Sequence, residues 1–330
     1  MILLTGATGY LGSAIARELI ARHEPFRVLA RDPTRLGFVP SECRCEVATG
    51  DLLDRAALRN ALQHVDEVLH TAALVRMWVR DRRDFRRVNV DGLQNLLQEA
   101  AQAGVRRVVY TSSFIALGPS ADENAGEGLR NPGPFSNEYE ESKAQALEWL
   151  RSEGLRQFPV IALLPGVIYG PGPNTEGNLV GGMINQYLDR KFPGLLGSGE
   201  QRWSFAFNAD VVNAHLAALQ KGKPGEEYVL GGDNRTLNDF FRVLAGFTHV
   251  QQPVRHLPFA VGKLLGTVEV ARARMWGHPP QLTPGVVEVF KHDWVYSSAK
   301  AIRELGYRVA PLEEGLLKTL DITKAYDGPH

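Results

Sequence analysis

The sequence has few cysteines, no charge imbalance and no long hydrophobic run. The two cysteines among its 330 residues, Cys43 and Cys45, stand one residue apart. They exclude a disulfide framework, and we expect small residues entering a strand rather than a metal site. Basic and acidic residues number 37 each, which argues against a nucleic-acid or anionic membrane partner. The most apolar stretch, 257–270, is interrupted by Lys263 and Glu269, so we expect no membrane insertion. No basic leader precedes the first apolar residues, and the expected location is the cytoplasm.

The first residues predict a nucleotide-binding turn. Residues 2–4 form a short apolar strand, and residues 13–21 carry a helical apolar pattern. Between them stand Gly6, Gly9 and Gly12, at the spacing that serves a tight turn, close approach to a pyrophosphate and close helix–strand packing. The helix N-terminus then offers free N–H groups and its positive dipole end to phosphate oxygens. We therefore expect a dinucleotide site here.

The first half of the chain alternates strand and helix patterns. The expected strands cover 26–30, 45–47, 67–71, 107–111 and 160–164, and the expected helices cover 55–62, 85–103 and 136–153. This alternation predicts an α/β fold with a Rossmann-like, doubly wound parallel sheet. After Pro165, glycine and proline become frequent, which indicates a smaller C-terminal substrate lobe. The expected division is 1–165 for the dinucleotide-binding domain, with 204–232 returning to it through a strand at 228–230, and 166–203 and 233–330 for the substrate-binding lobe.

Two polar groups point to acid–base chemistry. Tyr139 and Lys143 stand four residues apart in an expected helix and so share one face. A tyrosine, with a pKa near 10, acts as a base at neutral pH only when a nearby cation stabilises its phenolate. Ser112 and Ser113 follow the strand at 107–111, at the sheet edge where doubly wound folds bind ligands, and Ser113 could hydrogen-bond a substrate oxygen. Taken alone, the Tyr–Lys pair also fits a solvated helix face, and the serines also fit a cap or turn.

Seven short motifs occur in a fixed order along the first two thirds of the chain. They are Thr5-Gly6-x-x-Gly9-x-x-Gly12, Gly50-Asp51-Leu52, His70-Thr71-Ala72-Ala73, Val88-Asn89-Val90-x-Gly92, Tyr110-Thr111-Ser112-Ser113, Tyr139-x-x-x-Lys143 and Pro165-Gly166-Val167-Ile168-Tyr169-Gly170-Pro171-Gly172. In this order they resemble the extended short-chain dehydrogenase/reductase family, and within it the dihydroflavonol reductase and 3β-hydroxysteroid dehydrogenase branch. A narrower resemblance, to plant farnesol dehydrogenases, rests on Tyr110-Thr111-Ser112-Ser113-Phe114-x-Ala116-Leu117-Gly118, Pro165-Gly166-Val167-Ile168, Gly197-Ser198-Gly199, Arg202-x-Ser204-Phe205 and His292-x-Trp294-x-Tyr296-Ser297.

The resemblance implies a role for each matching residue. Tyr139 would be the general acid/base, Lys143 its pKa depressor and ribose ligand, and Ser113 the residue that positions the substrate oxygen. Asn89 would support the lysine and a proton-relay water. Asp51 would bond the adenine, and the backbone after Pro165 would meet the nicotinamide carboxamide. The implied cofactor-binding residues are Gly6, Thr8, Gly9, Tyr10, Leu11, Gly12, Asp51, Leu52, Ala72, Ala73, Tyr139, Lys143, Pro165, Val167 and Ile168.

The resemblance also implies a homodimer built on the helices at 85–103 and 136–153. The chain departs from the family pattern at Phe207-Asn208-Ala209-Asp210, where the family has histidine-valine-x-aspartate. No polar substrate contact is therefore expected from Phe207.

The end of the second strand bears on the choice of cofactor. An acidic residue there would bond the ribose hydroxyls and repel a 2′-phosphate, but the chain has Ala30, followed by Arg31 and, close by, Arg35. Because arginine pairs with phosphate and stacks on adenine, we expect Arg31 to bind the cofactor and the cofactor to be NADP(H). NAD(H) is the alternative, because Asp32 is adjacent and plant farnesol dehydrogenases with a similar arginine are associated with NAD.

The expected substrate is a small, apolar molecule. Sugar-nucleotide members of the family often carry an arginine before the Pro-Gly pair, where this chain has Leu164. Aromatic side chains in the expected substrate lobe suit an apolar ligand, although each also fits an ordinary core. We expect an NAD(P)-dependent oxidoreductase that interconverts an apolar alcohol and its aldehyde or ketone, of farnesol, dihydroflavonol or hydroxysteroid type. The alternatives are a sugar-nucleotide epimerase or dehydratase and a non-catalytic NAD(P)-sensing protein. The expected substrate-binding residues are Trp78, Phe114, Asn178, Arg202 and Trp203.

Overall fold

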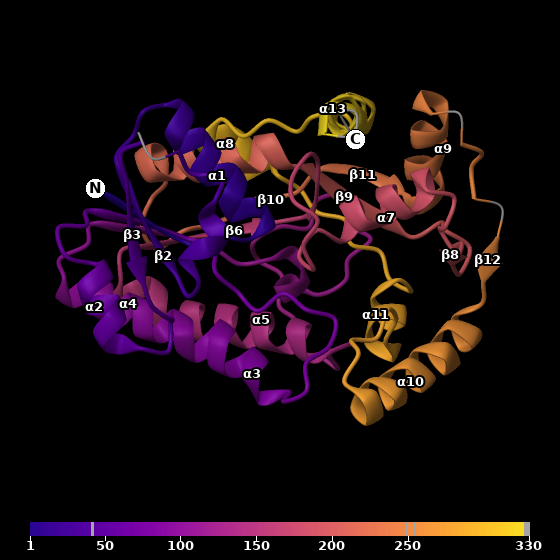
Figure 1. Cartoon of the computed structure of the whole chain (residues 1–330), viewed down its shortest axis with the longest axis horizontal. Helices are drawn as coiled ribbons and strands as arrows, with labels where there is room; N and C mark the ends of the chain where they lie inside the picture. Colours follow the sequence, from indigo (N-terminus) through magenta and orange to yellow (C-terminus); the bar gives the residue numbers. More distant parts are fainter. Residues whose placement is uncertain (41–42, 249, 254, 327–330) are drawn as a thin grey trace.

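A seven-stranded parallel sheet forms the centre of the molecule (Figure 1). The computed structural model describes residues 1–40, 43–248, 250–253 and 255–326. The strands of the sheet are β1 (Ile2–Thr5), β2 (Phe26–Ala30), β3 (Cys45–Thr49), β4 (Glu67–His70), β5 (Arg107–Thr111), β6 (Val160–Pro165) and β10 (Glu227–Leu230). Their order is β3-β2-β1-β4-β5-β6-β10, so the winding direction reverses between β1 and β4. The predicted doubly wound fold is confirmed, and ligands in such folds bind at this reversal.

Helices cover both faces of the sheet, because successive strand residues point to opposite sides. In β1, Leu3 packs into the core on one face and Leu4 into the core on the other. The covering helices are α1 (Tyr10–Ala21), α2 (Arg55–Ala61), α4 (Gly92–Gln102), α5 (Glu138–Trp149), α8 (Asn208–Lys221) and α12 (Ala299–Leu305). In Figure 1, α1 and α8 lie above the sheet, and α2, α4 and α5 lie below it.

A smaller layer beside the sheet is built largely from residues after β6. Its strands form one sheet in the order β11-β9-β7 and another from β12 and β8. The bounds are β7 (Val167–Tyr169), β8 (Leu195–Leu196), β9 (Arg202–Phe207), β11 (Asp233–Thr236), β12 (His256–Leu257), α7 (Leu179–Leu188), α9 (Leu237–Phe247), α10 (Phe259–Trp276), α11 (Pro284–Val289) and α13 (Leu312–Tyr326). The domain boundaries given above stay a prediction.

Two of the expected helices contain a wider turn. The segment expected as one helix over 85–103 consists of α3 (Arg83–Arg86), a π-helical turn (Arg87–Asp91) and α4. The segment over 136–153 consists of α5 and a second π-helical turn (Leu150–Gly154), which is followed by the short α6 (Leu155–Gln157). Such turns insert one extra residue and often mark functional positions. The first of them carries Asn89.

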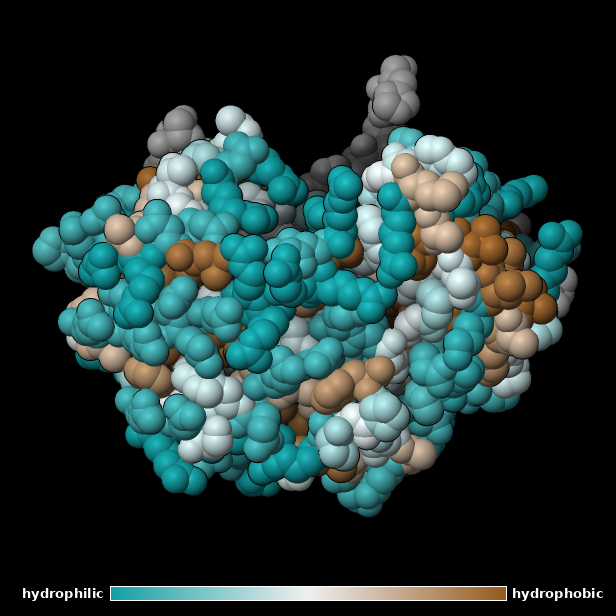
Figure 2. All heavy atoms as spheres, turned by 90° about the horizontal axis from the view of Figure 1, so that it is seen from below, coloured by the Kyte–Doolittle hydropathy of each residue, from teal (hydrophilic) through white to brown (hydrophobic). Residues whose placement is uncertain are grey.

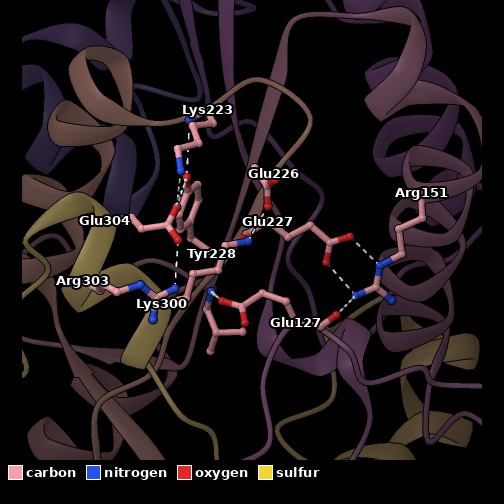
Figure 3. A network of polar contacts seen from close by, with 10 residues as sticks. Glu127, Arg151, Lys223, Glu226, Glu227, Tyr228, Lys300, Arg303 and Glu304 are labelled. Atoms are coloured by element: carbon pink, nitrogen blue, oxygen red, sulfur yellow. Dashed lines mark hydrogen bonds and ion pairs between the residues drawn. The ribbon is translucent and has the colours of Figure 1, made fainter.

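A polar network fixes β10 at the edge of the sheet (Figure 3). Arg151 forms a two-point ion pair with Glu227, with both nitrogen–oxygen distances at 2.6 Å, and the two side chains are 8% and 9% exposed. The same arginine donates to the backbone carbonyl of Glu127 at 2.6 Å. The Glu127 carboxylate accepts the N–H of Val229 at 2.8 Å, and the Lys300 ammonium donates to the carbonyl of Glu227 at 2.6 Å. Side chains from three separate segments therefore hold this strand.

Candidate active site

The turn after β1 and the first turn of α1 each contain a position with room only for glycine. Gly6 has a φ of +81°, and a Cβ there would lie 2.6 Å from the amide nitrogen of Ala72. A Cβ on Gly12 would lie 2.1 Å from the carbonyl oxygen of Gly6. α1 begins at Tyr10, directly after Gly9, which has no side chain to cap the first N–H groups. This cradle fits a pyrophosphate, because backbone donors and the positive helix end face the space that the glycines leave open.

A cavity of about 1290 Å³ lies along the carboxyl ends of the strands. Pockets for one small molecule commonly measure about 300–1,000 Å³, so this cavity has room for a dinucleotide and a second molecule. The predicted cofactor residues that line it are Gly6, Thr8, Gly9, Tyr10, Leu11, Gly12, Arg31, Asp51, Leu52, Ala72, Ala73, Tyr139, Lys143, Pro165, Val167 and Ile168. The structure thus brings this whole set to one cavity.

α5 carries Tyr139 and Lys143 into the cavity lining. The helix starts where the Asn137 side chain accepts the N–H of Glu140 at 2.8 Å, a common helix N-cap. Lys143 is 2% exposed, and its ammonium donates to the carbonyl of Thr111 at 3.2 Å. Because Thr111 ends β5, this bond ties the lysine to the strand that is followed by Ser113.

Burial sets the protonation of both groups. It raises the pKa of Tyr139 to about 12, while a hydrogen bond with Ser113 acts in the opposite direction. Burial also lowers the pKa of Lys143 to about 7. The phenol is therefore a proton donor at neutral pH, and the lysine changes charge near neutrality. The predicted lowering of the tyrosine pKa by the lysine stays a prediction.

Asn89 joins the loop after β4 to α5. Its side-chain oxygen accepts the N–H of Leu74 at 2.7 Å, and its nitrogen donates to the carbonyl of Leu74 at 3.1 Å and to the Ser142 hydroxyl at 2.9 Å. That hydroxyl donates in turn to the carbonyl of Tyr139 at 2.8 Å. Asn89 is absent from the described residues that line the cavity. In this structure it positions the loop and the helix that carry lining residues.

Apolar side chains from several segments also line the cavity, together with charged ones such as Arg76, Asp81 and Glu176. Three expected substrate residues line it: Trp78, Phe114 and Trp203. The sequence reasoning missed Val286, Val289 and Phe290, which also line it. Thr283 caps α11 by accepting the N–H of Val286 at 3.1 Å, and the Thr-Pro pair at 283–284 could have signalled a helix start. Nothing local in the sequence signals that this helix faces the cavity.

The other two expected substrate residues have structural partners. Asn178 caps α7 by accepting the N–H of Gly181 at 3.0 Å. Arg202 pairs with Glu123 at 2.6 Å and donates to the carbonyl of Ala121 at 2.8 Å. Neither residue is found in the described lining of the cavity. The structure therefore does not bring them to the Tyr–Lys pair.

At the other end of the cavity, basic side chains follow β2. Arg31 and Arg35 both line the cavity, and the Arg31 guanidinium is 3.7 Å from the Asp51 carboxylate. The Asp32 carboxylate accepts the N–H of Thr34 at 3.1 Å and caps the 3₁₀ turn Pro33–Leu36. The acidic residue beside Arg31 is thus engaged in a local turn.

Three further observations concern metals, membranes and thiols. Within the described ranges, no group of three or more histidine, cysteine or acidic residues could hold a metal ion. No helix in those same ranges has the length and apolar character needed to cross a bilayer. Cys43 and Cys45 are free thiols.

Comparison with known proteins identifies the family. The family model described as NAD dependent epimerase/dehydratase family matches residues 2–231. The chain is 34% identical to sterol demethylase protein B of Methylococcus capsulatus over 78% of this chain and 77% of the relative. It is 28% identical to a putative dihydroflavonol 4-reductase of Synechocystis, over 95% of this chain and 91% of the relative.

A solved relative shows the same architecture. The structure of DesIV, a dTDP-glucose 4,6-dehydratase from Streptomyces venezuelae crystallised with NAD, matches with a TM-score of 0.77 and 25% identity, over 99% of this chain and 98% of that chain. The predicted placement in the extended short-chain dehydrogenase/reductase family is confirmed, as is a nicotinamide dinucleotide cofactor. The narrower likeness to farnesol dehydrogenases stays a prediction. The chain belongs to the NAD-dependent epimerase/dehydratase family.

Proposed function

We propose that the chain is an NAD(P)-dependent oxidoreductase that interconverts an apolar alcohol and its aldehyde or ketone. The observation that supports this most directly is that the half-buried Tyr139 lines the same cavity as the aromatic side chains Trp78, Phe114, Trp203 and Phe290. Aromatic side chains in a cavity lining suit an apolar ligand. The names of two relatives, a sterol demethylase protein and a putative dihydroflavonol reductase, support the same substrate class.

The chain's own residues perform the proton step. When bound, the nicotinamide ring gives or takes the hydride. In the reducing direction Tyr139 donates its phenolic proton to the substrate oxygen, and its pKa of about 12 keeps that proton available at neutral pH. The Ser113 hydroxyl donates a hydrogen bond to the same oxygen, and Lys143 holds the ribose and supports the phenolate left behind. In the oxidising direction Tyr139 takes the hydroxyl proton back.

Replacing the phenol tests this assignment. Tyr139→Phe removes one oxygen and should lower kcat by at least 10²-fold, the low end for general acid–base catalysis, while cofactor binding is kept. Tyr169→Phe is the control, because it removes the same hydroxyl from a fully buried tyrosine that is outside the described cavity lining. Turnover is measured by the absorbance of the reduced nicotinamide. Near-normal turnover by folded Tyr139→Phe would show that Tyr139 is not the general acid/base.

A substrate panel tests the substrate class. Prenyl alcohols, flavanonols, hydroxysteroids and UDP-sugars should be assayed with both cofactors. Along a homologous alcohol series, affinity should rise by up to about 0.8 kcal/mol per buried methylene until the cavity is filled. The second candidate is a sugar-nucleotide epimerase or dehydratase, favoured by the likeness to DesIV. A flat alcohol series together with tight UDP-sugar binding would support that candidate instead.

NADP(H) is the proposed cofactor form. Arg31 and Arg35 line the cavity beside the end of β2, and an arginine there can pair with a 2′-phosphate. Arg31→Ala should weaken NADP binding by about 1.5–3 kcal/mol, the range for hydrogen bonds to charged groups, and leave NAD binding nearly unchanged. Calorimetric titration of both cofactors measures this. Equal losses for both cofactors would assign Arg31 to adenine stacking or to structure.

The homodimer on the helices at 85–103 and 136–153 and the cytoplasmic location also stay proposals. Light scattering at micromolar concentration tests the first, with a mass of two chains expected. A monomer mass would contradict it.

A further inference from the structure

α10 turns its large apolar side chains outward. Leu264, Met275 and Trp276 are 65%, 68% and 62% exposed, and Val261, Leu265 and Val268 are each more than two fifths exposed. Their spacing of three, four and seven residues places most of them on one side of the helix. α10 lies at the lower right of Figure 1, outside α11. In the view from below, hydrophobic residues gather toward the right-hand edge, on the side where α10 lies (Figure 2).

The opposite side of α10 is made of small residues that allow close packing. A Cβ on Gly262 would lie 2.8 Å from the Leu196 side chain, and one on Gly266 would lie 2.8 Å from the backbone of Thr283. Ala273 completes this side at 2% exposure. A surface helix normally buries its large apolar residues and exposes its polar ones. This helix does the reverse, and a contiguous apolar patch of this kind marks an interaction surface.

The charges on α10 are mostly positive. The helix carries Lys263, Arg272 and Arg274 against a single carboxylate, that of Glu269. Glu269 is paired with Arg272 at 3.1 Å. The chain as a whole has a formal net charge of +0, so this excess is local. Arg272 stands four residues from both Val268 and Trp276 and so lies on the apolar side, whereas Lys263 and Arg274 lie further round the helix. An exposed apolar helix face that carries cations matches the interface of an anionic lipid bilayer, in which apolar side chains enter the acyl boundary and cations meet the headgroups.

The end of α10 leads into the cavity. Gly277 follows the helix directly, and both Gly277 and Pro279 line the cavity. Further along the chain, Val286 and Val289 of α11 and then Phe290 add apolar lining. An apolar molecule at the outward face of α10 would therefore be close to the end of the helix that borders the cavity.

We propose that α10 binds the surface of an anionic lipid membrane, from which the apolar substrate enters the cavity. The helix lies at the interface and does not cross the bilayer, in keeping with the absence of a spanning helix among the described residues. The delivery of substrate rests on the proposed function, whereas the binding to lipid does not. A second copy of the chain is the competing occupant of this face.

Trp276 provides a direct probe. The full chain, without substrate, is mixed with vesicles of phosphatidylcholine containing 30% phosphatidylglycerol, and with vesicles of phosphatidylcholine alone. With the anionic vesicles we expect the protein to co-sediment and its tryptophan emission to shift to the blue. The blue shift should be absent in Trp276→Phe, because that variant lacks the reporting indole. Raising the salt concentration should weaken binding, because the cationic part of the attraction is screened.

Two variants test whether the vesicles bind the apolar face of α10 or any exposed apolar side chain. The double variant Leu264→Ser/Leu265→Ser should lower vesicle partitioning at least tenfold. Ile302→Ser is the matched control, because Ile302 is 49% exposed on α12, away from α10, and it should bind as the wild type does. Turnover of a short, water-soluble alcohol should stay unchanged in the double variant, whereas turnover of a substrate embedded in vesicles should fall.

The outcomes are distinct. Failure to sediment with either kind of vesicle overturns the proposal. A dimer that the double variant dissociates, without vesicle binding by the wild type, also overturns it and assigns the face to a second copy. Vesicle binding with no turnover of any alcohol would support lipid binding by α10 and contradict the proposed oxidoreductase activity.

Discussion

Replacing Lys143 by methionine is expected to stabilise the cofactor-free protein by an amount that depends on pH. The lysine is 2% exposed, and its burial lowers its pKa from 10.5 to about 7. Between these two values the unfolded chain holds a proton on this side chain and the folded chain does not, so the stability of the wild type rises with pH. Below pH 7 both states are charged, and the cost of burying the charge is present in full.

The size of this cost follows from the two pKa values. One pKa unit corresponds to about 1.4 kcal/mol, so a change from 10.5 to about 7 corresponds to about 5 kcal/mol. Methionine has a similar length and no charge to bury. It also loses the bond to the Thr111 carbonyl, which costs about 1–3 kcal/mol at any pH, because that acceptor is left unpaired. The net gain of the variant should therefore be about 2–4 kcal/mol near pH 6.5 and should vanish or reverse near pH 10.

Urea unfolding of both proteins at several pH values between 6 and 10 measures the difference. Lys191→Met is the control, because the side chain of Lys191 is 75% exposed, and its effect should be small throughout. A difference between Lys143→Met and the wild type that is constant over this range would refute the reasoning, since a packing effect alone does not titrate.

Three further predictions concern other buried or crowded groups. Arg151→Met leaves the Glu227 carboxylate buried without its partner and should cost about 3–5 kcal/mol in urea unfolding; a loss below about 1 kcal/mol would contradict this. Burial lowers the pKa of His215 from 6.5 to about 4, so the unfolded chain takes up more protons as the pH falls and stability is lost between these values. His215→Gln should flatten that slope in unfolding curves at pH 4–7, and an unchanged slope would rule out His215 as its source. Gly12→Ala places a Cβ 2.1 Å from the Gly6 carbonyl oxygen and should weaken dinucleotide binding at least tenfold, or about 1.4 kcal/mol; calorimetric titration with an unchanged Kd would contradict it.

The parts of the fold that local sequence determines were predictable. The glycines at 6, 9 and 12 and the alternating apolar segments specify strand, turn and helix within a few residues of each other, and the predicted sheet is confirmed. Tyr139 and Lys143 could be paired because one helix sets their spacing. The wide turn at Asn89 was not predictable, because its bonds reach Leu74 and Ser142 in other segments.

The substrate side of the cavity depends on contacts between distant segments. Phe290 lies against Trp203, with ring centroids 4.5 Å apart, and no motif links the two positions. Arg202 was expected at the substrate, but its partner Glu123 comes from a loop 79 residues earlier. Whole-chain charge does not describe single elements: α10 carries three cations and one carboxylate within a chain that has 37 of each.

The hydrogen bond between Glu127 and Val229 bears on whether another chain can add a strand to the edge of the sheet. β10 is the last strand of its sheet, and an edge strand with unpaired backbone groups is a template for adding a strand of another chain. Here the outward N–H of Val229 is taken by the Glu127 carboxylate, and the carbonyl of Glu227 by the Lys300 ammonium. A strand approaching this edge would have to displace two charged side chains before it could form a ladder. β10 is thus protected against the addition of a strand from another chain by charged side chains and not by a further strand of its own sheet.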